Sequence, residues 1–468
     1  MTDTGKVVDE VRDPWFHRWA GLPGEWRRRY RALDDRQRFQ IGVVVRVLIV
    51  IGLIFIDWPV ALLVAVLFAA QYGVRYIPQP YARYARFLIP TILLIVCLTY
   101  PFLYSDNPVF LQGRTMHLLG DYPTLGTAVI MGVYAMMAIG LNIVVGYAGL
   151  LDLGYVAFYA MGAYTCAWFA SVQFAHHSLH LGAVGVGPNT PGIHISIWIL
   201  LLLAGIFTAF IGVIIGLPTL RLRGDYLAIV TLGFGEILPQ VARNGDNLGG
   251  FNLTNGPNGI TPVDPPGFGG LNYLSGSGTF FTSERLFFWT VLALVIITIF
   301  CSLRLRDSRL GRAWIAIRED ETAAAAMGIP LMRTKTWAYA TGAFFGGLAG
   351  AYFASFKQST FPGDFSFNIS AFILSMVILG GMGNVWGVVF GGAFLAFLNQ
   401  QGLADIGHSI NQTFGTNLDV PKYQFGIYGL IIVLTMLIRP EGLIPSARRR
   451  AELREGVQDT PLYDAQHE

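Results

Sequence analysis

Few residues of this chain could do chemistry, and the clearest are carboxylates that interrupt apolar sequence. Glu236 lies inside the apolar segment 225–242, and Asp152 and Asp225 are expected near the inner surface of the membrane. A carboxylate at membrane depth is costly, so it usually faces a cavity or a polar partner. The functional interpretation is that these groups line a route for a solute. A structural role for Glu236, as a hydrogen-bond partner of a neighbouring broken helix, stays open.

Motifs for enzyme chemistry are missing. An ATP-binding loop of the form G-x-x-x-x-G-K-[ST] needs a lysine directly after a glycine. The chain has four lysines, and only Lys6 follows a glycine, with Val7 after it. Neither H-E-x-x-H, C-x-x-C nor G-x-S-x-G occurs. The sequence therefore predicts a protein that is not an enzyme and that binds no cofactor itself.

Histidines gather in the segment 173–192, which contains His176, His177 and His180. Histidines at such spacing can bind a metal ion. No cysteine or nearby carboxylate completes the ligand set, however, so a solvated polar loop is the favoured interpretation.

Composition places the chain in a membrane. It has 468 residues, of which 53% are hydrophobic and 13% are charged, and its mean hydropathy is +0.52. Soluble domains carry about 25% charged residues. Three cysteines lie in apolar runs, where a thiol acts as a small hydrophobe: Cys97, Cys166 and Cys301. We therefore predict an all-α, polytopic membrane helical bundle and no disulfide framework.

The positions of about 10–12 spans follow from apolar segments near the roughly 20 residues that cross a bilayer. We expect spans near 41–57, 59–73, 87–104, 122–146, 151–172, 193–217, 225–242, 285–303, 336–356, 369–400 and 422–438.

Three of these regions are expected to be irregular. The segment 369–400 is too long for one span and is interrupted by glycines at 380–383, so it is predicted to form two shorter elements. The segment 225–242 contains two glycines and a proline, which predicts a broken helix. The run 146–154 combines three glycines with Asp152 and indicates the irregular backbone that transporters use near their pathway.

The distribution of basic residues predicts the orientation. With the N-terminus in the cytoplasm, 26 of the 32 Lys and Arg residues fall in cytoplasmic segments and five fall outside. Cytoplasmic loops carry the excess of basic residues in membrane proteins. Both termini are therefore expected in the cytoplasm, and 243–284 is expected to be a long outer loop.

Small residues repeat at a spacing of four in two segments. They are Gly342, Gly346 and Gly350 in the first, and Gly383, Gly387 and Gly391 in the second. This spacing lets helix backbones approach closely in lipid. Sliding surfaces or an interface with another subunit are the functional interpretation, and static packing within one bundle is the alternative.

The largest cytoplasmic loop, 304–335, is predicted to dock a partner. Arg312 to Met327 contains good helix formers without Pro or Gly, so we expect one helix that ends at Gly328 and Pro330. Docking to a cytoplasmic protein is favoured over a helix that lies on the bilayer. The candidate contact residues are Arg312, Arg318, Glu319, Asp320, Glu321, Ala324 and Gly328.

Six sequence blocks resemble one family of transport proteins. They are GLNIVVGYAGLLDLGYVAFYAMGAY (140–164), LPTLRLRGDYLAIVTLGFGEI (217–237), TNGPNGI (254–260), GRAWIAIREDETAAAAMGI (311–329), VILGGMGN (377–384) and RPEGLIP (439–445). In this order they resemble the M-type permease subunit of bacterial branched-chain amino acid ABC importers. The resemblance covers roughly 120–445.

This resemblance implies the domain organisation and the surroundings of the chain. It implies a permease domain at 121–445, preceded by a basic tail (1–40) and extra spans with an outer loop (41–120), and followed by a cytoplasmic tail (446–468). The implied location is the bacterial inner membrane. The implied partners are a homologous H-type permease, two cytoplasmic ATP-binding subunits that hydrolyse ATP, a periplasmic amino-acid-binding protein and membrane lipid, with no nucleic acid.

The resemblance also implies roles for residues. Block 311–329 corresponds to the segment that couples the permease to the ATPase. Candidates for the translocation pathway are Asn142, Asp152, Tyr226, Thr231 and Glu236. The expected substrates are leucine, isoleucine, valine or similar amino acids. A permease for urea or short-chain amides is the alternative within the class. A secondary transporter would need intramembrane coupling groups, for which Glu236 alone is thin support. A membrane enzyme would need a catalytic set of residues, which the sequence does not show.

Overall fold

The computed structural model describes residues 88–103, 123–175, 177–187, 189–222, 224–247, 249–268, 271–274, 282–415, 419–438 and 442–444. The chain divides into two compact units, Met1–Tyr122 and Pro123–Glu468. Helix α7 (Leu88–Leu103) belongs to the first unit. The expected spans 41–57 and 59–73 and both terminal tails lie outside the described residues.

Helices make up almost all of the second unit. The long ones are α8 (Leu125–Leu141), α9 (Val156–Phe169), α10 (Ile197–Thr219), α11 (Asp225–Arg243), α12 (Ser283–Asp307), α13 (Arg309–Glu319), α15 (Leu331–Lys357), α16 (Phe367–Gly380), α17 (Val385–Phe397), α18 (Leu403–Phe414) and α19 (Gln424–Ile438). The short ones are the π-helices η4 (Asn142–Tyr147) and η8 (Leu398–Gly402), helix α14 (Glu321–Ala326), and the 3-10 turns η5 (Val172–Phe174), η6 (Gly256–Asn258), η7 (Pro362–Phe365) and η9 (Val420–Tyr423). These helices confirm the all-α bundle.

Two small sheets lie in the connections. Strands β1 (Ala170–Ser171), β3 (Ile193–Ile195) and β2 (Leu179–Leu181) pair in that order, and β4 (Gly267–Phe268) pairs with β5 (Leu271–Asn272). Strand β1 is antiparallel to β3, with Ala170 opposite His194, whereas β2 is parallel to β3. The sequence analysis did not predict these strands.

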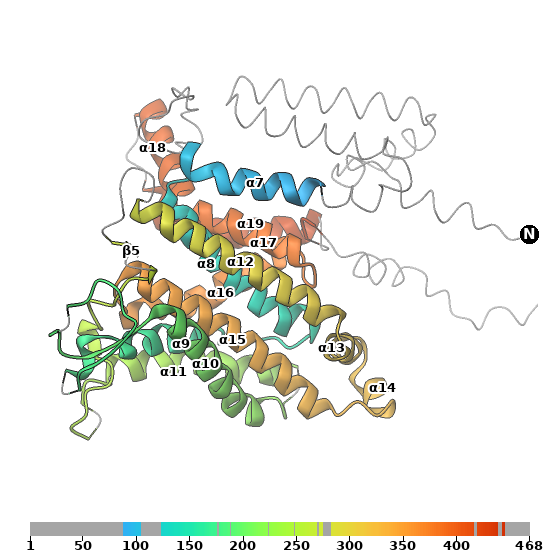
Figure 1. Cartoon of the computed structure of the whole chain (residues 1–468). Coiled ribbons are helices and arrows are strands. Elements are labelled where there is room, and N and C mark those ends of the chain that lie inside the picture. The colour runs from blue at the N-terminus through green and yellow to red at the C-terminus, as the bar shows by residue number, and fades with distance from the viewer. Residues whose placement is uncertain are drawn as a thin grey trace, which may run out of the picture. The chain divides into compact units, whose positions relative to one another are not determined.

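Helix α15 lies at the centre of the second unit and packs against α8, α9 and α10 (Figure 1). Its glycines make the close contacts. A Cβ on Gly350 would lie 2.0 Å from the carbonyl oxygen of Tyr159 in α9, and one on Gly342 would lie 2.4 Å from Val144. Because only glycine leaves room for these contacts, the backbones of α9 and α15 touch.

The second glycine series packs α16 against α17. A Cβ on Gly387 would lie 2.2 Å from the carbonyl oxygen of Gly380, and one on Gly391 would lie 2.7 Å from that of Met376. Gly383 is not helical and lies in the turn between the two helices. Gly346, in α15, would place a Cβ 3.1 Å from the Tyr155 hydroxyl. Both series thus contact other parts of this chain.

Helices occupy each expected span within the described residues. Four are long and apolar enough to cross a membrane, namely Leu125–Tyr147, Ile197–Thr219, Ser283–Asp307 and Val420–Leu437. Two shorter apolar helices, Val156–Phe169 and Phe367–Gly380, accompany them. The prediction that 369–400 forms two elements is confirmed by α16 and α17.

The prediction of a broken helix at 225–242 is wrong, because α11 is continuous and contains Pro239. One of its two glycines, Gly235, serves packing instead of a break. A Cβ on Gly235 would lie 3.3 Å from the Cα of Gly154, so this glycine admits the neighbouring backbone, while a Cβ on Gly233 would meet open space.

The prediction of one helix from Arg312 to Met327 is also wrong. Helix α13 ends at Glu319, and Asp320 in extended conformation caps the separate helix α14. The Asp320 carboxylate accepts hydrogen bonds from the backbone N–H groups of Thr322 (2.7 Å) and Ala323 (3.0 Å). An aspartate that caps a helix ends the preceding one, since its own backbone is not helical. The expected end at Gly328 is confirmed, and its φ is 82°.

The described connections of the second unit gather at two ends of the bundle. At one end, here called the α13 end, Arg318 contacts Gly146, and Leu443 bonds to Leu379. At the other, here called the strand end, bridges join Ser171 to Val263 and Ile260 to Thr360. Figure 1 shows α13 and α14 far from β5.

The close contact of α9 and α15 predicts a large effect of Gly350→Ala. The added methyl would overlap the Tyr159 carbonyl, so we expect the free energy of unfolding to fall by about 1–3 kcal/mol. Thermal unfolding of the purified protein in detergent measures this. The matched control is Gly429→Ala in α19, where a Cβ meets open space, and it should leave stability unchanged or raise it by up to about 1 kcal/mol, because alanine favours a helix over glycine. Equal stability of the two variants would contradict the proposed packing.

Candidate functional site

The segment 148–155, between η4 and α9, runs irregularly into the interior of the bundle. Asp152 is 1% exposed, and its Oδ1 accepts a hydrogen bond from the backbone N–H of Gly154 at 2.9 Å. The buried hydroxyl of Tyr155 donates to the carbonyl oxygen of Gly342 at 2.9 Å. Gly342 is about 16 Å along α15 from its first residue, at 1.5 Å per residue. The irregular segment therefore reaches well beyond the α13 end.

Helix α11 and helix α16 satisfy the backbone of this segment. The N–H of Leu153 donates to Thr231 Oγ1 at 3.1 Å, and the N–H of Val156 donates to Ser370 Oγ at 2.8 Å. A Cβ on Gly154 would lie 2.1 Å from the carbonyl oxygen of Thr231. The structure thus brings together two of the predicted pathway residues, Asp152 and Thr231.

The Asp152 carboxylate is enclosed within the bundle. Its Oδ2 is buried, and Tyr339 of α15 lies beside the carboxylate as a side-chain hydrogen-bond partner. A carboxylate oxygen forms strong hydrogen bonds with charged donors such as an ammonium group. The arrangement can therefore attract a positively charged group.

Asn142 lies elsewhere, at the α13 end. It is fully buried in η4, and its Oδ1 accepts a hydrogen bond from the N–H of Gly383 at 2.8 Å. Its Nδ2 has no partner among the residues that the structure describes. This hydrogen bond links Asn142 to the turn between α16 and α17.

Tyr226 and Glu236 lie on the exposed face of α11. Tyr226 is 71% exposed, and Glu236, Gln240 and Asn244 follow one another at a spacing of four, which places them on one side of the helix. A shallow open hollow is lined by Glu236, Ile237, Gln240, Val241 and Asn244. Lipid cannot solvate a carboxylate and two amides, so this face suits contact with protein or water.

The segment α13–α14 exposes some of the predicted docking residues and buries others. Arg312, Glu319, Asp320 and Gly328 are exposed, and Met327 is 83% exposed. Ala324 is 4% exposed and so packs within this chain, where we had expected it on a docking surface.

Contacts that the sequence did not reveal hold α13–α14 on the bundle. Glu321 pairs with the buried Lys335 of α15 at 2.8 Å. The indole N–H of the fully buried Trp314 donates to the carbonyl oxygen of Thr334 at 2.9 Å. The one feature of the sequence that could have indicated these contacts is an apolar residue, Trp314, in a basic and polar segment.

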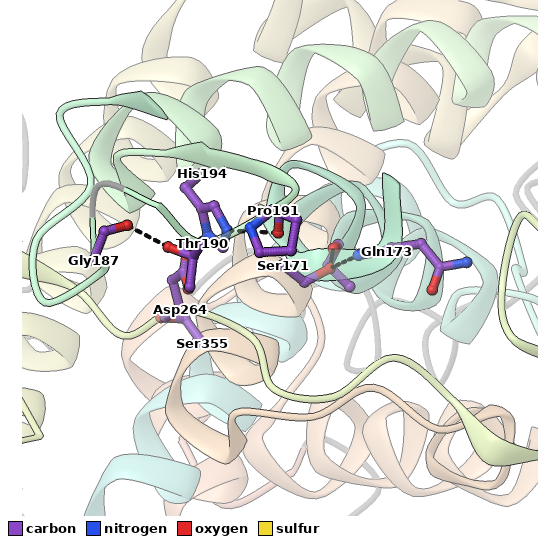
Figure 2. A network of polar contacts seen from close by, with 9 residues as sticks. Ser171, Gln173, Gly187, Thr190, Pro191, His194, Asp264 and Ser355 are labelled. Atoms are coloured by element: carbon purple, nitrogen blue, oxygen red, sulfur yellow. Dashed lines mark hydrogen bonds and ion pairs between the residues drawn. The ribbon is translucent and has the colours of Figure 1, made fainter. Parts of the chain in front are cut away.

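A histidine and an aspartate join two connections at the strand end (Figure 2). His194 of β3 is buried, and its Nδ1 lies 2.7 Å from Asp264 Oδ2. The ring of His180 stacks on His194 with centroids 5.1 Å apart. Burial raises the pKa of the Asp264 carboxyl, and the hydrogen bond with His194 opposes this rise. Ser355 of α15 donates to the Asp264 carbonyl at 3.1 Å, so the pair anchors two loops to the central helix.

The metal interpretation of the histidines gains no support. His176 lies outside the described residues, and His180 stacks on His194, which the sequence analysis did not single out. In the part of the chain that the structure describes, no group of three or more His, Cys, Asp and Glu side chains could hold a metal ion.

Comparison with known proteins identifies the family. Residues 124–436 match the family model described as the permease component of the branched-chain amino acid transport system. The chain belongs to this permease family. The resemblance predicted from the six sequence blocks is thereby confirmed, and the permease is a multi-pass membrane protein. The match begins one residue after the boundary between the two units.

Named relatives extend the match. The permease is 35% identical over 379 residues to the high-affinity branched-chain amino acid transport system permease protein LivM of Salmonella typhimurium. This alignment covers 78% of this chain and 76% of that protein. It is 33% identical over 417 residues to LivM of Escherichia coli, with 83% and 84% covered. LivH of Salmonella typhimurium is 24% identical over 319 residues, with 66% and 91% covered. No solved structure matches significantly.

The contact between Thr231 and Leu153 predicts a test of the irregular segment. Thr231→Val keeps the shape of the side chain but leaves the buried N–H of Leu153 without an acceptor, which costs about 1–3 kcal/mol. We expect a lower unfolding temperature for this variant, and Thr231→Ser should restore it because the hydroxyl returns. Thermal unfolding of the purified permease measures both variants. If Thr231→Val is as stable as the unmodified protein, the hydroxyl does not support the segment.

Proposed function

We propose that the permease is the membrane-spanning subunit of an ATP-driven importer for leucine, isoleucine, valine or similar amino acids. The observation that carries this proposal is the match to the permease family over 124–436, together with two relatives named as LivM. The proposed location is the bacterial inner membrane, with both termini in the cytoplasm. The permease itself carries out no chemical step and binds no cofactor.

The proposed membrane partner is a homologous H-type permease. The similarity to LivH supports a pair of related subunits. The exposed face of α11 supports it as well, because Glu236, Gln240 and Asn244 need a polar surface opposite them. In this proposal the two permeases enclose the route, with Asp152 and Thr231 in its interior and Glu236 on the α11 face.

The proposed cytoplasmic partners are two ATP-binding subunits that dock on α13–α14. The exposed residues of this segment, including Met327, Glu319 and Asp320, would form the contact. A periplasmic amino-acid-binding protein would deliver the substrate at the strand end. The permease then needs no tight site, since the binding protein supplies the specificity.

The proposed mechanism is a change between inward-open and outward-open states. When ATP binding closes the two ATPase subunits, the segment docked on them moves as a rigid body. ATP shifts the equilibrium only by its different affinity for the two states. The continuous contact of α15 with α8, α9 and α10 favours such rigid-body movement, because the helices cannot slide independently past touching backbones.

Orientation is tested by cysteine labelling of a variant that lacks Cys97, Cys166 and Cys301. Both Asn258 and Thr322 are exposed, at the strand end and in α14 respectively. We expect an impermeant maleimide to label Asn258→Cys in intact cells. It should label Thr322→Cys only after the membrane is opened, because basic residues concentrate at the α13 end. The reverse pattern would overturn the proposed orientation.

Transport is tested in proteoliposomes that contain the permease, its proposed partner subunits and the binding protein. We expect ATP-dependent uptake of labelled leucine, and Glu236→Gln should lower it by about fivefold or more while the complex still assembles. The matched control is Glu284→Gln, an exposed glutamate at the start of α12, which should leave uptake unchanged. Uptake of urea but not leucine would show an amide permease, and uptake without ATP would show a secondary transporter.

A further inference from the structure

Arg318 of α13 reaches into the membrane bundle. Its guanidinium Nη1 donates a hydrogen bond to the carbonyl oxygen of Gly146 in η4. A Cβ on Gly149 would lie 2.8 Å from Arg318 Cγ, and one on Gly383 would lie 3.3 Å from Arg318 Nη1. Both glycines have positive φ, 71° and 84°, which favours glycine at these positions. Two separate membrane elements therefore form a cradle for one arginine.

The cradle lies where several elements are already joined. Asn142, in the same π-helix as Gly146, accepts a hydrogen bond from the N–H of Gly383 at 2.8 Å. Asn384 Nδ2 in turn donates to the carbonyl oxygen of Ile444 at 2.7 Å. Hydrogen bonds thus connect η4, the turn between α16 and α17, and the segment 442–444, with Arg318 at their edge.

The other side of α13 is fixed to α15. Trp314 bonds to the Thr334 carbonyl, and Glu321 of α14 pairs with Lys335. Trp314 is fully buried and Lys335 is 4% exposed, so water does not loosen these contacts. Helices α13 and α14 and the first turns of α15 therefore form one rigid body, and Arg318 connects it to η4.

We propose that Arg318 is a positioning residue that transmits movement of α13–α14 to η4 and to the α16–α17 turn. This rests on the proposed function, in which ATP-binding subunits displace α13–α14. The guanidinium keeps its charge throughout, and hydrogen bonds from charged donors are roughly twice as strong as neutral ones. The contact with Gly146 therefore holds while α13 moves.

The π-helix η4 is suited to respond to a movement of Arg318. Its backbone bonds depart from the regular α-helical pattern, as in the bond from the Ala148 N–H to the Ile143 carbonyl at 3.3 Å, and single π turns within α-helices often lie at functional sites. Asn142 and Gly146 are four residues apart, so a displacement of the Gly146 carbonyl acts on the Asn142–Gly383 hydrogen bond. Arg318 thereby reaches the turn between the two short helices α16 and α17.

The test compares Arg318→Met and Arg318→Lys in the full complex in proteoliposomes. Methionine keeps the length of the side chain without a donor, and lysine keeps the charge with a single donor group. We expect Arg318→Met to keep the ATP-binding subunits bound and to keep ATP hydrolysis within about twofold, while leucine uptake per ATP hydrolysed falls by about tenfold. Arg318→Lys should restore part of this ratio. Arg221→Met, an exposed arginine after α10, is the control that should leave it unchanged.

Two outcomes would overturn the proposal. If Arg318→Met loses the ATP-binding subunits, Arg318 serves docking or stability. If uptake per ATP stays unchanged in the assembled complex, Arg318 transmits nothing. Failure of the unmodified complex to take up leucine would instead contradict the proposed function.

A second measurement does not depend on the substrate. Met382, in the α16–α17 turn, is half-buried, and in a background without other cysteines Met382→Cys reports accessibility of the turn. We expect ATP to change its rate of maleimide labelling by about fivefold or more when Arg318 is present. Arg318→Met should remove that change even if transport is absent. An equal response with and without Arg318 would contradict the proposal.

Discussion

Backbone contact between α9 and α15 is the constraint on which the rest of the second unit depends. Gly162 and Gly350 leave no room for a Cβ at this interface, where a Cβ on Gly162 would lie 2.0 Å from the Gly347 carbonyl oxygen. Lipid provides no hydrophobic drive for helices to associate, so close van der Waals packing must stabilise their association. Helices α8 and α10 pack on the same central helix, and α15 thus determines the position of the other elements.

This packing lets irregular backbone exist inside the bundle. The segment 148–155 would be untenable in contact with lipid, because its N–H groups need acceptors. The hydroxyl of Thr231 accepts from the N–H of Leu153, and that of Ser370 accepts from the N–H of Val156 at the start of α9. The same arrangement leaves the Asp152 carboxylate buried beside Tyr339. A polar position in the interior is therefore a product of tight helix packing around a short loop.

Charged side chains at the α13 end connect the segment α13–α14 to the interior of the bundle. Glu321 of α14 pairs with Lys335 of α15, and Arg318 of α13 donates to the Gly146 carbonyl of η4. At the strand end, His194 and Asp264 anchor two loops to α15 in a similar way. Both ends of the permease are thus fixed to the same central helix, which favours movement of the whole bundle.

The amino-acid sequence alone was enough to predict the membrane environment of the chain, its helical bundle and its family. Apolar runs of fixed length and six sequence blocks are local properties, so they predicted the helical bundle and the division of 369–400. The location and contacts of each polar side chain depend on the tertiary structure. Asp320 ends a helix because its side chain caps the next one, and Arg318 points inward because Gly149 and Gly383 make room for it. Helix α11 is continuous, and its Gly235 admits the backbone of Gly154. These contacts join residues far apart in the chain, and no local pattern encodes their geometry.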